Sequence, residues 1–316
     1  MAEVGEEVRA HLAAHGWVTT TARLQTMGVT PAQISSLLTT GVLVRLRRST
    51  FIDGERWRAG QPWERHALRA RAVAAATCHP GSPFTLSHHS ALAVRGVGLF
   101  GVDDRVHLAR TDGRRGRSGK VVHVHPPVLP RWVGEVDGIP AVLPALACLQ
   151  VGAAFGIVPG LVSADSALRL GATDRAGLEA ARPYLVGPRS PRADVVVEHA
   201  TGLSDSGGET RCRWLMHTLG LPAPELQVPV YDDAGELVGI VDFLFGEQWT
   251  VVEFDGALKY GGPADVVAEK RREDRLRELG YEVVRIVWAD LAHPERVLSK
   301  IRAAFARARA RHGSHV

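Results

Sequence analysis

Acidic residues recur in the last third of the chain at positions where strands are expected. Glu253 and Asp255 lie in the run Val-Glu-Phe-Asp-Gly, and Asp242 lies eleven residues before Glu253. Glu209 comes earlier, in a segment with helical spacing. Close carboxylates suit a hard divalent cation, because such ions prefer oxygen ligands. We therefore expect Mg²⁺, or Mn²⁺ in its place, as a cofactor.

The elements around these acids are expected in the order helix, three strands, helix, strand. Apolar periodicity and turn residues place the helices at 206–219 and 264–279 and the strands at 226–231, 237–245, 249–255 and 282–288. The connection between the last two strands is long enough for a parallel crossover. The chain is therefore expected to be a mixed α/β protein with a C-terminal domain over 206–316.

The expected strands and helix bring the acids together. Side chains alternate along a strand, so Glu253 and Asp255 share one face. Asp242 interrupts an apolar strand, where an ionised carboxylate needs a partner or a metal. Glu209 is expected on the helix face that looks toward the sheet. These positions predict a metal site of Asp242, Glu253 and Asp255, with Glu209 assisting and Lys259 stabilising phosphate charge.

A second interpretation of the same acids is structural. Arginines such as Arg213 and Arg272 are close in sequence to these elements. Ion-pair networks can gather carboxylates in the same way that metal sites do. The sequence favours the metal site, because two of the acids lie in apolar strands.

The first 60 residues are expected to form three short helices followed by a β-ribbon. Thr30 and Gln33 have the spacing of a capping box, with Pro31 at the first helical position. This layout is typical of a winged helix-turn-helix, whose third helix enters the major groove of DNA. Arg45, Arg47 and Arg48 would then lie on the wing, near phosphates. A small helical domain without DNA contact is the alternative.

The middle region, 61–186, is expected to mix strands and helices. It contains a flexible basic loop over 110–120, whose cations can neutralise phosphates or simply keep the loop soluble. The cations at its tip are Arg114, Arg115, Arg117 and Lys120. His88 and His89 are adjacent, so on a helix they point about 100° apart and are poor ligands for one ion. A linker is expected over 187–205, which begins with Pro, Arg and Ser.

Charge and composition point to a polyanion partner. Residues 1–130 contain 17 Lys and Arg against 9 Asp and Glu, whereas residues 131–316 contain 21 against 25. An excess of positive charge confined to one half suggests contact with nucleic acid, DNA first and RNA second. The three cysteines are widely spaced and give no disulfide framework. No apolar run is long enough to span a membrane, and we expect a cytoplasmic protein without membrane contact.

The acidic motifs carry a resemblance to a known family. Val-Asp-Phe-Leu-Phe at 241–245, Val-Val-Glu-Phe-Asp-Gly-Ala-Leu-Lys-Tyr at 251–260 and the charged segment at 269–288 resemble the very-short-patch-repair-like endonuclease domains of actinobacteria. These belong to the restriction-endonuclease-like PD-(D/E)XK superfamily. The resemblance implies that Asp242 and Glu253 bind the divalent ion and that Glu209 supports them. The N-terminal part is similar, more loosely, to the winged-helix domain of abortive-infection type antitoxins.

One position departs from the superfamily pattern. The residue two after the Glu is usually Lys, and here it is Asp255. Lys259 or Lys270 would have to supply the positive charge. The sequence therefore leaves two functions open, which are Mg²⁺-dependent hydrolysis of DNA and non-catalytic DNA binding as a regulator or type IV antitoxin-like protein. An RNA-directed enzyme is a third interpretation.

Overall fold

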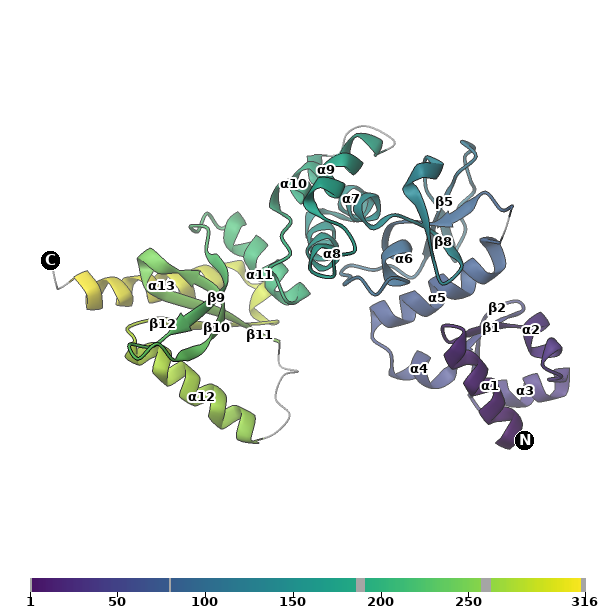
Figure 1. Ribbon diagram of the computed structural model, residues 1–316, viewed down its shortest axis with the longest axis horizontal. Coiled ribbons are helices and arrows are strands. Elements are labelled where there is room, and N and C mark those ends of the chain that lie inside the picture. The colour runs from purple at the N-terminus through teal and green to yellow at the C-terminus, as the bar shows by residue number, and fades with distance from the viewer. Residues whose placement is uncertain (1, 80, 186–190, 257–262, 314–316) are drawn as a thin grey trace. The chain divides into compact units, whose positions relative to one another are not determined.

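The computed structural model describes residues 2–79, 81–185, 191–256 and 263–313. These residues form a mixed α/β protein with three separate sheets, as expected from the sequence (Figure 1). The chain divides into two compact units, Met1–Ala200 and Thr201–Val316. None of the described helices combines the length and the apolar character needed to cross a membrane.

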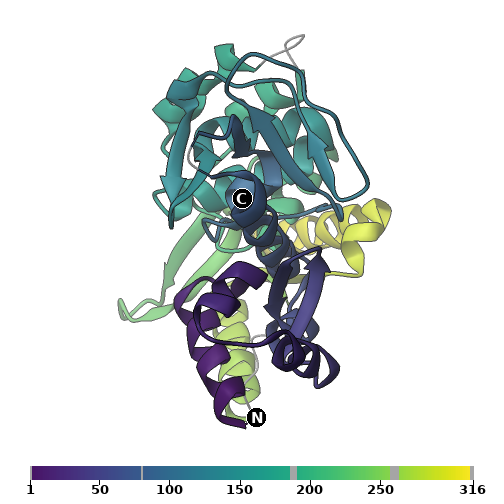
Figure 2. The same cartoon turned by 90° about the vertical axis from the view of Figure 1, so that its right-hand side faces the viewer.

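The N-terminal part of the first unit is a helical cluster with a small antiparallel sheet (Figure 2). The sheet has the strand order β1-β3-β2, and β2 and β3 form a hairpin. Its elements are α1 (Ala2–Ala14), β1 (Val18–Thr20), α2 (Thr21–Thr26), α3 (Pro31–Thr39), β2 (Leu43–Arg47), β3 (Thr50–Asp53) and α4 (Gly54–Ala59).

Local sequence explains why these elements begin and end where they do. The capping box predicted at Thr30 is confirmed, because Thr30 Oγ1 accepts from Gln33 N–H and Gln33 Oε1 accepts from Thr30 N–H. The apolar faces of α1, α2 and α3 meet in one core with β2 and β3, which includes Leu12, Leu24 and Phe51. The short strand β1 was not predicted.

The rest of the first unit combines a five-stranded mixed sheet with a helical group. The sheet order is β6-β5-β4-β8-β7, and α5 and α6 contact it. Its elements are α5 (Pro62–Thr77), β4 (Phe84–Leu86), α6 (His88–Ala93), β5 (Val106–Arg110), β6 (Val122–Val124), η1 (Pro130–Trp132), β7 (Val133–Val136) and β8 (Ile139–Val142). The helical group is α7 (Pro144–Phe155), α8 (Ile157–Arg169), α9 (Arg175–Ala181), η2 (Arg182–Tyr184) and α10 (Pro191–His199).

The segment expected to be a linker, 187–205, contains a packed helix. Helix α10 buries Val196 and Val197 and contacts α7 and α8. Gly152 and Gly160 allow this close approach, because a Cβ at either position would meet Val196. The compact units divide after Ala200, so α10 belongs to the first unit. The Pro- and Arg-rich composition at the start of the segment concealed its apolar helical face.

The second unit follows the predicted order of elements from α11 to β12 and ends with a helix, α13, that was not predicted. Its sheet has the order β12-β11-β10-β9, with β11 and β12 parallel and the other pairs antiparallel. Its elements are α11 (Gly207–Thr218), β9 (Glu225–Tyr231), β10 (Leu237–Phe245), η3 (Gly246–Gln248), β11 (Thr250–Asp255), α12 (Pro263–Glu278), β12 (Glu282–Val287), η4 (Asp290–Ala292) and α13 (Pro294–His312).

Helices cover both faces of this sheet (Figure 1). On one face, α11 and α13 enclose a core that includes Met216, Phe243 and Ile301. On the other face, Leu276 of α12 packs on Val251. The two clusters show which strand positions face which helix, and so they fix the direction of the acids on β11.

The first turn of α11 lies against the sheet because Gly208 has no side chain. A Cβ at this position would overlap the Phe254 ring. We therefore predict that Gly208→Ala destabilises the second unit by about 1–3 kcal/mol through overpacking. The measurement is urea unfolding of the full chain, followed by hydrogen exchange of the β10 and β11 amides. Gly246→Ala is the control, since the nearest atom there would lie 3.6 Å away. Equal stability of the two variants would contradict this packing.

A candidate carboxylate site on the C-terminal sheet

Asp242 lies where β10 begins to separate from β11. The last regular pair between these strands is Phe243 with Val252, so Asp242 lies beside Glu253 at the next position. Asp242 Oδ2 accepts a hydrogen bond of 2.8 Å from the Phe254 backbone N–H. The Asp242 carboxylate thus takes the place of a backbone carbonyl as the acceptor for a β11 N–H. This bond fixes Oδ2, while Oδ1 faces Gln227 on β9.

Gln227 on β9 joins Asp242 to Glu209. Its Nε2 donates to Asp242 Oδ1 at 3.3 Å and to Glu209 Oε2 at 3.0 Å. Gln227 has a φ of 51°, in the left-handed region that a non-glycine residue rarely adopts. Backbone strain of this kind persists where the surroundings hold it. Sequence reasoning missed Gln227, because an amide in a strand gives no local signal of such a role.

Glu209 is buried at the start of α11, with 2% of its surface exposed. Its carboxylate accepts from Asp205 N–H at 2.8 Å and from Ser206 Oγ at 2.8 Å, while Ser206 caps the helix. Burial raises the pKa of Glu209, and the nearby Asp242 raises it further. Glu209 therefore stabilises the helix terminus and also lies within electrostatic reach of Asp242.

Glu253 faces the opposite helix. Its neighbours on β11, Val252 and Phe254, belong to the core under α11 and α13, so Glu253 points toward α12. There its Oε1 accepts from Arg272 Nη2 at 2.6 Å. Burial raises the pKa of Glu253, and the opposing effect of Arg272 is smaller. Arg272, which the sequence nominated as a structural partner for the acids, does bind one of them.

A larger ion-pair network surrounds this contact. Arg285 on β12 binds two acids of α12, Glu269 at 2.5 Å and Glu273 at 2.8 Å. It also lies 3.9 Å from Glu253 and 3.8 Å from Asp255. Asp255, two residues after Glu253 on β11, therefore lies next to the same guanidinium group.

The predicted site residues are brought together only in part. Asp242 raises the pKa of both Glu209 and Glu253, yet Glu209 and Glu253 reach the sheet from opposite faces. Within the described ranges, no three His, Cys, Asp or Glu side chains form a group that could hold a metal ion. Lys259 lies outside the described residues, and Lys270 is exposed on α12.

The predicted DNA-contacting residues lie on the first unit. Arg45 and Arg48 are exposed and Arg47 is partly buried on the β2–β3 hairpin. Arg114, Arg115, Arg117 and Lys120 are all exposed. The loop that carries these four folds back on β6. Ser118 Oγ accepts from Val124 N–H, and Gly119 N–H donates to the Val122 carbonyl. It is thus tied to the sheet edge along its second half.

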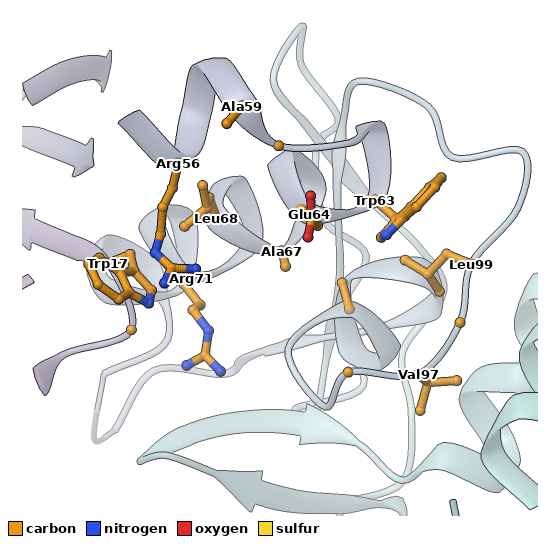
Figure 3. Close-up of a pocket in the computed structure, with 15 residues that line it drawn as sticks. Trp17, Arg56, Ala59, Trp63, Glu64, Ala67, Leu68, Arg71, Val97 and Leu99 are labelled. Atoms are coloured by element: carbon orange, nitrogen blue, oxygen red, sulfur yellow. The ribbon is translucent and has the colours of Figure 1, made fainter. Parts of the chain in front are cut away.

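The first unit also has a cavity of about 580 Å³ beside α5 (Figure 3). Each charged side chain that lines it already has an internal partner. The Arg56 guanidinium lies 3.7 Å from the Trp17 ring centre, Arg71 pairs with Asp137 at 2.8 Å, and Glu64 accepts from Gln61 N–H. The carboxylates of the second unit, which carry unbalanced charge, are therefore the stronger candidate site.

Six histidines form a cluster in the first unit that sequence reasoning did not anticipate. They come from α5, α6, β5, β6 and the residue after β6, His125, and their rings contact one another. His107 is central, with Nε2 2.8 Å from Asp103 and Nδ1 3.0 Å from His125 Nε2. The other members are His66, His88, His89 and His123. His88 and His89 thus belong to a packed group.

Comparison with known proteins gives no activity for this arrangement. The chain matches no known protein-family model. Two proteins of Mycobacterium tuberculosis, from strains CDC 1551 and H37Rv and both named uncharacterized, are 32% identical to it over 177 residues. The match covers 55% of this chain and 65% of each relative. The chain thus spans less than two thirds of these relatives.

The histidine cluster predicts acid sensitivity of the first unit. Burial lowers the pKa of His66 to about 4 and those of His89 and His125 to about 3. These rings stay neutral in the folded state, whereas the unfolded chain takes up protons below its ordinary pKa of about 6.5. Stability is therefore intact above pH 6.5 and falls as the pH drops below it. The loss is about 1.4 kcal/mol per histidine between pH 7.5 and 5.5.

The measurement is hydrogen exchange of the α5 and α6 amides in the full chain at pH 7.5 and 5.5, corrected for intrinsic exchange. His89→Leu should reduce the pH dependence by the share of one histidine. An unchanged pH dependence in this variant would show that His89 is not held neutral.

Proposed function

We propose that the protein binds DNA through residues 1–60 and carries a nuclease-like C-terminal domain that hydrolyses DNA phosphodiester bonds with Mg²⁺ or Mn²⁺. The observation that carries this proposal is the placement of Asp242 beside Glu253, where two antiparallel strands separate. Carboxylates on neighbouring strands, within the order helix, three strands, helix, strand, support a restriction-endonuclease-like domain of the PD-(D/E)XK type.

The donor set fits a hard divalent ion. Asp242 and Glu253 offer carboxylate oxygens, which Mg²⁺ prefers, and Mg²⁺ needs only one or two from the protein. Burial and the charge of Asp242 raise the pKa values of Glu209 and Glu253, so a cation here would relieve an excess of negative charge. When bound, such an ion supplies an activated water and charge stabilisation at the phosphate.

Each residue then has a defined part. Asp242 and Glu253 hold the ion, and the Phe254 N–H fixes the direction of Asp242. The Gln227 amide donates to both Glu209 and Asp242, so Glu209 helps to position Asp242 through Gln227. Asp255 orients a water or adds a ligand, and Lys259 remains the proposed partner of the phosphate charge.

The N-terminal part supports a winged helix-turn-helix. Helix α3 begins at a capping box and the β2–β3 hairpin follows it, which is the order that places a helix in the major groove and a wing at the backbone. Exposed Arg45 and Arg48 on the hairpin suit phosphate contacts. The looser likeness to abortive-infection type antitoxins agrees with DNA binding by this part.

A specific observation favours a second function. Arg272 binds Glu253, and Asp255 occupies the position where the superfamily usually has Lys. A site closed in this way suits a non-catalytic DNA-binding regulator or antitoxin-like protein with a degenerate nuclease fold. The two functions share the DNA-binding surface and differ in whether the carboxylates support hydrolysis.

Incubation with supercoiled plasmid, single-stranded DNA and RNA separates these functions. With Mg²⁺ or Mn²⁺ we expect metal-dependent cleavage of DNA, and a loss of at least about 100-fold in Asp242→Asn, because the variant removes a charged ligand but keeps its shape. Asp233→Asn, in the β9–β10 turn, is the matched control. Absence of cleavage by the wild type would favour the non-catalytic function, and preferential cleavage of RNA would replace DNA as substrate. Cleavage that survives Asp242→Asn would contradict the assigned site.

The wing makes a prediction about salt. If Arg45 and Arg48 contact phosphates, the double variant Arg45→Ala/Arg48→Ala should weaken binding to all sequences and reduce the slope of log affinity against log salt by about 2. Fluorescence anisotropy with a labelled duplex at several salt concentrations measures this slope. Arg192→Ala, at an exposed position of α10, is the control. A slope unchanged from the wild type would exclude the hairpin as the phosphate-binding surface.

A further inference from the structure

Arg272 reaches the candidate site from α12 and is held there by two acids. Its Nη2 lies 2.6 Å from Glu253 Oε1 and 2.6 Å from Glu269 Oε1, and its Nε donates to Glu269 Oε2 at 2.9 Å. Glu269 is three residues earlier on the same helix, so it anchors the guanidinium locally. Of these two acids, Glu253 is also a proposed metal ligand, whereas Glu269 is not.

Gly239 on β10 makes this reach possible. A Cβ at this position would lie 2.9 Å from Arg272 Cδ and 3.3 Å from Arg272 Nη1. The stem of Arg272 therefore lies directly over the glycine backbone and crosses β10 on its way to β11. A side chain at 239 would displace the guanidinium without removing its charge.

The charges around Arg272 are unequal. Arg272 and Arg285, together with Arg277, which pairs with Glu273, face four acids on this side of the sheet, namely Glu253, Asp255, Glu269 and Glu273. Asp242 adds a further negative charge within electrostatic reach of Glu253. A divalent cation at Asp242 and Glu253 would thus meet net negative charge, but it must first displace Arg272 from Glu253.

A guanidinium released from a carboxylate is well suited to a phosphate. Both ligands accept two parallel N–H groups, and arginine binds each in the same fork geometry. Glu269 binds both Nε and Nη2, so Arg272 keeps this partner when the Nη2 bond to Glu253 is broken and the planar guanidinium turns toward a phosphate. The positive charge missing at position 255 would then come from α12.

We propose that Arg272 is an exchangeable cation that couples metal binding to phosphodiester binding at this site. Without metal and nucleic acid, Arg272 neutralises Glu253 and keeps the site closed. When a divalent ion takes Glu253, Arg272 turns to a phosphate of the bound strand. The inference rests on the proposed metal-dependent function, and it adds that metal and DNA each strengthen the binding of the other.

Calorimetric titration of the full chain with Mn²⁺ alone tests the first half. Arg272→Ala should bind Mn²⁺ more tightly than the wild type by about 10-fold, within the usual range of coupling between sites. Gly239→Val should also raise the Mn²⁺ affinity, because it displaces the Arg272 guanidinium from Glu253 while the charge of Arg272 is kept. Arg275→Ala is the matched control, because Arg275 lies on the same helix and pairs with Asp232 in the hairpin. Thermal unfolding shows whether each variant is folded, and Gly239→Val serves if Arg272→Ala is not.

DNA binding tests the second half without any cleavage. Fluorescence anisotropy with a labelled duplex is measured with and without Ca²⁺, a hard ion that prefers the same oxygen ligands. Ca²⁺ should strengthen binding by the wild type and Arg275→Ala but have little effect on Arg272→Ala. Equal Mn²⁺ affinity of Arg272→Ala and the wild type would overturn the inference even if the protein cleaves DNA.

The remaining outcomes are also decisive. Tighter Mn²⁺ binding by Arg272→Ala in a protein that cleaves nothing would uphold the exchange while refuting hydrolysis. Mn²⁺ binding that survives Asp242→Asn at full affinity would place the ion elsewhere and overturn the inference. The same holds if neither the wild type nor Arg272→Ala binds Mn²⁺.

Discussion

A carboxylate buried on the central strand β11 is the constraint from which the C-terminal unit is best understood. Glu253 is 8% exposed and lies beside Asp242. A buried negative charge is costly unless a cation or hydrogen bonds compensate it. In this structure the compensation comes from Arg272, which binds Glu253 at 2.6 Å. The position of α12 on the sheet and the absence of a side chain at Gly239 both serve this contact.

The same constraint shapes the other face of the sheet. Asp242 is held by the Phe254 N–H and by Gln227, and Gln227 in turn holds Glu209 at the start of α11. Gln227 thus joins Glu209 to Asp242, and the Phe254 N–H holds Asp242. Arg272 separately joins Glu253 to Glu269. This arrangement keeps the acids close without a metal, and it leaves raised pKa values at Glu209 and Glu253. We interpret it as a site whose neutralising groups can be exchanged.

Periodicity and turn residues were enough to predict the elements of the C-terminal unit from α11 to β12, but the C-terminal helix α13 was not predicted. The strands carry alternating or continuous apolar residues, and glycines such as Gly220 and Gly280 follow helix ends in the left-handed conformation. The alternation along β11 predicted that Glu253 and Asp255 share a face, but the expectation that this face looks toward Glu209 was wrong, because Glu253 faces away from the core of Phe243 and Phe254. Patterns of this kind depend on residues that are close in sequence, so they indicate helices and strands without knowledge of the tertiary contacts.

Contacts between distant elements could not be predicted in the same way. Gln227 acts through an unusual backbone conformation, and the histidine cluster gathers rings from four elements. The helix α10 was hidden by its Pro- and Arg-rich start, although Val196 and Val197 are buried. Arg272 was nominated only as one of several arginines. Arg272 reaches Glu253 because Gly239 has no side chain, and this contact joins residues that are far apart in sequence.

We propose that Asp242 and Glu253 form a cation site from which Arg272 is displaced. A crystal structure of the full chain with Mn²⁺ and a short DNA duplex, examined by anomalous scattering, would locate both groups. We expect an anomalous peak within coordination distance of the Asp242 and Glu253 oxygens, with the Arg272 guanidinium on a DNA phosphate. Arg272 still bound to Glu253, with no peak at these carboxylates, would contradict this proposal.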